Sequence, residues 1–161
     1  AAGEFSFIAM DDCVDLPATH WAGINGMPRL LEGAARIKGV PADQVNGEQV
    51  FAWIQEGDRR IQKLLGEYTR SIARMIMNLQ FIYDPQRFAI GGGISRQPLL
   101  MEQIRNNLDY LYALYPYQVP RAEVVVCRYY NDANLLGAYS NFMLQFTGQG
   151  KTEENRCQAR L

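Results

Sequence analysis

Apolar residues recur at three- and four-residue spacing over one long stretch of the chain, from about residue 58 to residue 83. This spacing places them on a single stripe of an α-helix, and the stripe comprises Ile61, Leu64, Leu65, Tyr68, Ile72, Met75, Ile76 and Leu79. Charged residues such as Arg59, Lys63 and Glu67 lie mostly off the stripe, as on a solvated face. A helix of about 25 residues would be about 37 Å long, so we expect it to span the whole domain.

The rest of the chain alternates short strand-like runs with shorter amphipathic helices. Strands are predicted at residues 5–10, 87–90 and 123–127, and the further helices at 28–38, after Asn46, from Pro98 and at 133–146. Residues 11–27 are rich in turn formers and are expected to be irregular. The β/α alternation predicts an α/β fold. We expect residues 1–146 to form one domain and residues 147–161 a loose polar tail.

Composition narrows the classes of function. Of the 161 residues 48% are hydrophobic and 20% charged, which is typical of a globular protein, and the net charge of −1 leaves no basic excess to bind nucleic acid directly. No run approaches the roughly 20 apolar residues of a membrane span, so no membrane contact and a cytoplasmic location are expected. One histidine and three scattered cysteines, with no C-x-x-C pair, predict no metal site and no zinc.

Three consecutive glycines, Gly91, Gly92 and Gly93, follow the predicted strand at 87–90. Glycines remove every side chain and permit positive φ, so a ligand can approach the backbone at the carboxyl end of a strand, where α/β proteins usually bind ligands. No Gly-Lys-Ser/Thr follows, so this is not a Walker A loop. The alternative interpretation is a tight strand-to-helix turn that binds nothing.

Four stretches in sequence order resemble motifs of one family. D-P-Q-R-F-A-I-G-G-G-I-S at residues 84–95 is similar to N/D-P-x-x-I-x-x-G-G-G-I-S, and D-A-N-L-L-G-A at 132–138 is similar to D-A-G-L-L-G-A-A. G-E-F-S-F at 3–7 is similar to G-E-I-G-H, and residues 25–34 are similar to a helix start S-G-P-A-L-L. These motifs are those of the ROK family of sugar kinases and sugar-responsive regulators, and the resemblance covers roughly residues 3–142.

The resemblance implies an actin-like, ribonuclease H-type α/β lobe with a mixed sheet flanked by helices. It would be the C-terminal lobe of a two-lobed protein that closes on a sugar and on ATP with Mg²⁺. The nucleotide pocket would be lined by Gly91, Gly92, Gly93 and Ser95. Glu4 would contact the sugar, and His20 is a second candidate that could equally be structural. On this basis we expect Gly92→Val to weaken ATP binding more than tenfold while leaving the fold largely intact.

The family's catalytic aspartate lies in an N-terminal N-D-x-N-A motif, so no catalytic residue is expected here and the fragment should be inactive alone. Residues 131–134 imitate that motif, but they precede the final predicted helix and are interpreted as a turn and helix cap. Phe7 stands where the family has a zinc-ligand histidine, and Cys13 stands alone where it has a cysteine-rich loop, which indicates the zinc-less branch. Phe5, Phe7 and Trp21 are expected to be core, or alternatively a wall that stacks on the sugar.

The resulting hypothesis is the nucleotide- and sugar-binding lobe of a ROK sugar kinase that phosphorylates a hexose or glycoside. The alternatives are a NagC-like transcriptional regulator, whose DNA-binding domain would lie upstream, and a sugar-binding pseudo-kinase. A homo-oligomer is expected, with the exposed side of the long helix as one possible interface. The sequence does not decide which sugar is bound.

Overall fold

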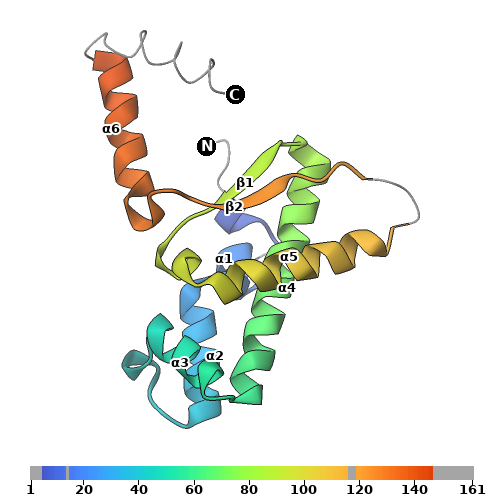
Figure 1. The fold of residues 1–161 in the computed structure, drawn as a ribbon, viewed down its shortest axis with the longest axis vertical. Coiled ribbons are helices and arrows are strands. Elements are labelled where there is room, and N and C mark those ends of the chain that lie inside the picture. Colours follow the sequence, from blue (N-terminus) through green and yellow to red (C-terminus); the bar gives the residue numbers. More distant parts are fainter. Residues whose placement is uncertain (1–4, 14, 116–118, 147–161) are drawn as a thin grey trace.

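The computed structural model describes residues 5–13, 15–115 and 119–146, and its central element is the predicted long helix (Figure 1). Helix α4 runs over Arg59–Tyr83, 25 residues. It begins at Asp58, whose side chain accepts the N–H groups of Arg60 and Ile61 as an N-cap. It ends at Asp84, which adopts a left-handed conformation with φ 44°. The prediction of one long helix is confirmed.

Helix α5, Pro98–Ala113, crosses α4 and makes the largest helix–helix contact of the fold (Figure 1). Both helices contribute fully buried apolar side chains to the core, Ile61 and Leu65 from α4 and Leu100 and Ile104 from α5. A polar pair sits within it, because the fully buried Thr69 accepts a hydrogen bond from Asn107 Nδ2 over 3.1 Å. This contact fixes the two helices relative to each other, and α5 leads back to the sheet.

Helices α2, Met27–Lys38, and α3, Gly47–Gln55, pack against the first half of α4. A Cβ atom at Gly33 would lie only 3.0 Å from Leu64 Cδ1, so the glycine lets α2 approach α4 closely. Asn46 caps α3 as predicted. Its side-chain oxygen accepts a hydrogen bond from the Gln49 N–H over 2.9 Å, and Gln49 Oε1 accepts one from the Asn46 N–H over 2.8 Å.

The sheet of the described residues has two strands, β1 (Arg87–Ile90) and β2 (Glu123–Val126), paired in parallel with Arg87 opposite Glu123. Both strands were predicted. The mixed sheet was not found in this part of the chain, because the expected third strand at 5–10 does not form. Helix α5 connects β1 to β2, and a strand–helix–strand connection produces a parallel pair.

The N-terminal segment differs from the prediction. Residues Phe5–Phe7 form a short 3₁₀-helix, and only Ala9 pairs in antiparallel fashion, with His20. The strand predicted from the apolar run at residues 5–10 is therefore wrong, and Phe7 is 73% exposed. The stretch expected to be irregular contains a helix, α1 (Trp21–Asn25), which packs on α4.

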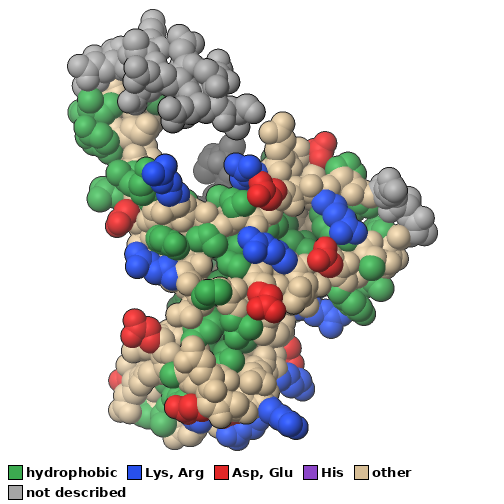
Figure 2. All heavy atoms as spheres, viewed as in Figure 1, with side chains coloured by type: hydrophobic (Ala, Val, Ile, Leu, Met, Phe, Trp, Pro, Cys, Tyr) green, Lys and Arg blue, Asp and Glu red, His purple; other side chains and the backbone are tan. Residues whose placement is uncertain are grey.

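The last described helix, α6 (Ala133–Phe146), has the predicted bounds but no buried residue. Figure 1 shows it standing apart from the other helices, and Figure 2 shows hydrophobic side chains gathered along it. The predicted tail at 147–161 lies outside the described residues. None of the helices in the described ranges combines the length and the apolar character needed to cross a bilayer.

Candidate functional site

The carboxyl ends of β1 and β2 lie at the same edge of the sheet because the strands are parallel. Each strand leads into a loop there: Gly91, Gly92 and Gly93, hereafter the glycine loop, follow β1, and residues 127–131 follow β2. The Cys127 N–H donates to Ile90 O over 2.8 Å, and the Gly92 N–H donates to Tyr130 O over 3.3 Å. These bonds join the two loops into one surface at the edge where α/β folds usually bind ligands.

Gly92 occupies a backbone conformation with φ 84° and ψ 166°, which is essentially restricted to glycine. A Cβ atom built there would meet nothing within 4 Å. Glycine is therefore required by the backbone, and the space above it is open. A side chain is strained at this φ whatever the space, so Gly92→Val is expected to lower stability as well as to change the surface of the loop.

Gly91 and Gly93 do not have positive φ, so their lack of a side chain serves another purpose. A Cβ at Gly93 would lie 3.3 Å from Asn131 Nδ2, so this glycine lets the second loop approach. A Cβ at Gly91 would be in ordinary contact, 3.6 Å from Tyr130 O, and the residue is exposed. Gly91 is thus exposed beside Gly92, above which the space is open.

Ser95 is buried and hydrogen-bonds to the backbone of the glycine loop. It is 2% exposed, and its Oγ donates to Gly92 O over 2.7 Å while its N–H donates to the same oxygen over 3.2 Å. Its hydroxyl proton is therefore already engaged within the protein. Ser95 therefore helps to hold the conformation of Gly92, and its place with the three glycines in a nucleotide pocket stays a prediction.

Sequence reasoning assigned residues 131–134 to a turn and cap and missed that this loop flanks the glycines. Residues Tyr130–Asp132 form a 3₁₀ turn directly before α6, which agrees with the turn. Tyr130 has φ 45°, and the Arg96 guanidinium lies 4.6 Å from the centre of its ring. The predicted order of strand, helix and strand over residues 87–127 was the signal that could have placed both loops at one edge, because such a connection produces a parallel pair.

The predicted sugar-binding residues belong to another part of the chain. Glu4 lies outside the described residues. His20 precedes α1, and α1 is anchored on α4 by the Asn25 Nδ2 bond to Ser71 Oγ over 2.9 Å. Phe7 is too exposed to be core, so that interpretation is wrong for it, whereas Phe5 packs edge-on against Tyr83 with ring centres 5.9 Å apart.

Potential metal ligands are scattered. Cys13 is exposed and Cys127 half-buried, both as free thiols. Within residues 5–13, 15–115 and 119–146, no group of three or more His, Cys, Asp or Glu side chains lies close enough to hold an ion. Cys157 falls outside these ranges.

The sequence profile of the ROK family matches residues 26–143, more than half of the chain. The chain belongs to the ROK family. Its curated relatives include a beta-glucoside kinase of Klebsiella pneumoniae, 32% identical over 143 residues, which cover 88% of this chain and 46% of that protein. A beta-glucoside kinase of Listeria monocytogenes is 26% identical over 122 residues, covering 76% of this chain and 37% of that protein. This ROK chain therefore spans less than half the length of these relatives.

Solved ROK structures share the fold. A ROK family protein from Streptococcus pneumoniae in complex with sucrose matches with a TM-score of 0.77 at 21% identity, over 91% of this chain and 50% of that one. A ROK family glucokinase from Streptomyces griseus in complex with glucose and AMPPNP matches with a TM-score of 0.70 at 20% identity, over 86% and 50%. The fold is the actin-like α/β fold of the ROK kinases, as the sequence motifs indicated.

Proposed function

We propose that this ROK chain is the nucleotide- and sugar-binding C-terminal lobe of a sugar kinase that transfers a phosphoryl group from ATP to a hexose or glycoside. The observation that carries the proposal is the uncovered backbone of the glycine loop at the carboxyl ends of two parallel strands. The curated relatives named above are beta-glucoside kinases, and the related glucokinase was solved with glucose and AMPPNP. These names favour a kinase over a regulator.

The residues present fit a nucleotide. Gly92 offers backbone with open space above it, Gly91 is exposed beside it, and the bond from Ser95 holds Gly92 in place. Asn131 lies beside Gly93 at the edge of the same surface. A bound ATP supplies the phosphoryl group, and Mg²⁺ is expected to be held largely by its phosphates. No zinc is expected to take part.

The chemistry also needs a general base for the sugar hydroxyl. The family's aspartate for this role belongs to a motif that this chain does not contain, so the chain alone is expected to bind ligands without turnover. Glu4 and His20 remain the proposed sugar contacts. We also propose that the protein is a cytoplasmic homo-oligomer and that this lobe contacts neither membrane nor nucleic acid.

The test uses the full-length protein that contains this lobe, assayed for ADP release with glucose and with a β-glucoside. Gly91→Val is the informative variant, because position 91 is exposed and has no positive φ, and a Cβ there would be in ordinary contact with Tyr130 O and Cys127 Cβ. We expect the dissociation constant for ATP to rise more than tenfold at an unchanged melting temperature. Sugar binding with no ATP turnover, together with DNA binding, would instead indicate a NagC-like regulator.

A further inference from the structure

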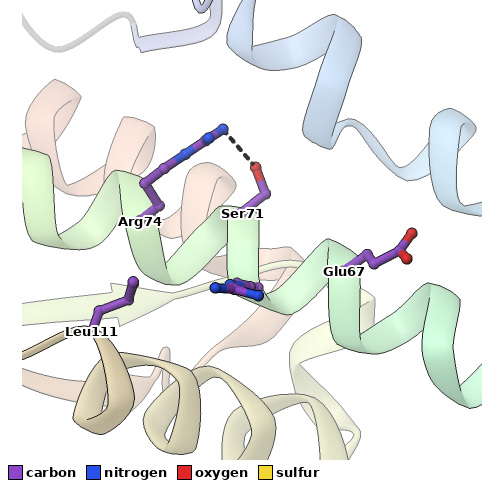
Figure 3. Close-up of a pocket in the computed structure, with 5 residues that line it drawn as sticks. Glu67, Ser71, Arg74 and Leu111 are labelled. Carbon is purple, nitrogen blue, oxygen red and sulfur yellow. Dashed lines mark hydrogen bonds between the residues drawn. The ribbon is translucent and has the colours of Figure 1, made fainter. Parts of the chain in front are cut away.

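A pocket of about 390 Å³ lies on the side of α4, and none of its lining residues belongs to the glycine loop (Figure 3). It is lined by Glu67, Arg70, Ser71, Arg74 and Leu111. The first four recur at the three- and four-residue spacing of one helix face, and Leu111 comes from α5. The site therefore rests on the rigid crossing of the two longest helices.

The pocket carries two arginines without acidic partners. Among the described residues, neither Arg70 nor Arg74 has a carboxylate within 4 Å. Glu67 lies 3.9 Å from Lys63 instead, and Figure 3 shows its carboxylate pointing away from Arg74. The Arg70 guanidinium is placed over the ring of Tyr110, 5.4 Å from its centre. The local charge on this face is positive although the whole chain is nearly neutral.

Ser71 adds a hydrogen-bond donor between the arginines. Its Oγ accepts from Asn25 Nδ2 over 2.9 Å. It also accepts from Arg74 Nη2 over 3.4 Å (Figure 3). Asn25 is 9% exposed, so this anchor is buried. A serine hydroxyl has two lone pairs and one proton. Both lone pairs are engaged, and within the described ranges no acceptor takes the proton.

We infer that this pocket binds a phosphate monoester. Guanidinium groups pair with phosphate oxygens through parallel N–H bonds, and the Ser71 proton supplies a further donor on the same helix face. All three polar groups donate, which suits a ligand whose oxygens only accept. The organic part of the ester would lie against Leu111. Both arginines are exposed, so binding weakens as ionic strength rises.

The test is an NMR titration of the ¹⁵N-labelled chain with glucose 6-phosphate, with AMP and with glucose as the uncharged control. We expect saturable shifts centred on Ser71 with either phosphate ester and none with glucose. The ester that binds more tightly identifies the kind of organic group that the pocket prefers. Arg70→Gln and Arg74→Gln should each weaken binding at least tenfold. Arg59→Gln, an exposed arginine on the same helix roughly 16 Å from Arg70 along its axis, should leave binding unchanged.

Absence of a saturable shift at Ser71 with both esters would overturn the inference. So would an equal loss of affinity in Arg59→Gln, because binding would then follow overall charge. Gly92→Ala separates this site from the nucleotide proposal, since it alters the glycine loop and should not change the shifts at Ser71. A negative result here therefore leaves the proposed function untouched.

Discussion

Replacing Gly92 with alanine is expected to destabilise the fold even though the added methyl group meets no atom within 4 Å. The cost comes from the backbone, because φ 84° with ψ 166° is a region that side-chain-bearing residues avoid. Holding a residue in such a region costs on the order of 1–3 kcal/mol. For a chain of this size 1 kcal/mol corresponds to about 2–4 °C in melting temperature, so we expect Tm to fall by roughly 2–12 °C.

Gly91→Ala is the matched control in the same loop. Position 91 has no positive φ, and its Cβ would be in ordinary contact with Tyr130 O at 3.6 Å and Cys127 Cβ at 3.7 Å. Its effect on the free energy of unfolding should stay within about 0.5 kcal/mol. Urea denaturation and calorimetric melting of both variants measure the difference. Equal stabilities for the two would refute the argument that only Gly92 needs glycine for its conformation.

Three further predictions concern stability. Gly66→Ala should raise the free energy of unfolding by about 0.5–1 kcal/mol, because Gly66 lies inside α4 and a Cβ there would meet nothing within 4 Å. A lower free energy of unfolding in urea denaturation would contradict this. Leu65 is 0% exposed, so Leu65→Ala should lower the free energy of unfolding by about 2–5 kcal/mol. Leu135 in α6 is 72% exposed, so Leu135→Ala should change it by no more than about 0.5 kcal/mol. Similar melting temperatures for the two variants would contradict the exposed placement of α6. The hydrogen bond from Lys38 lowers the pKa of Asp58 below its usual 3.8. This carboxylate therefore stabilises the fold above that pH, and its contribution is lost as pH falls through the lowered pKa. Asp58→Asn should make the melting temperature depend less on pH in that window, and an unchanged pH dependence would contradict this.

The parts of the fold that the sequence predicts are those with local causes. Asn46 and Asp58 mark helix starts because their short polar side chains satisfy the first N–H groups of a helix. Asp84, followed by Pro85, marks the end of α4. The apolar stripe of α4 that begins at Ile61 is long enough to show the three- and four-residue spacing of a helix.

The errors arise where structure depends on a distant partner. A strand needs a neighbour, and among the residues that the structure describes the apolar run around Phe7 has none beyond the single bridge between Ala9 and His20. Helix α1, with five residues, is too short to show periodicity. The amphipathic pattern of α6 placed the helix correctly but could not tell that its apolar side chains are exposed.

The candidate site was predictable in part for the same reason. Three glycines after a strand are a local signal, and the structure shows the uncovered backbone that they imply. The approach of Tyr130 and Asn131 depends on the register of β1 against β2, which no local pattern encodes. The phosphate pocket depends on the crossing of α4 and α5, and Arg70 and Arg74 by themselves resemble a solvated helix face.

The central claim, that a nucleotide lies against the glycine loop, is tested most directly by titrating AMPPNP into the ¹⁵N-labelled chain and mapping the shifted amide signals. The account predicts saturable shifts at Gly91, Gly92 and Gly93 and in the neighbouring loop at Tyr130 and Asn131, since hydrogen bonds and close contacts join the two loops. Gly91→Val should abolish these shifts while the other signals keep their positions. Saturable binding that leaves the glycine loop unshifted would contradict the account.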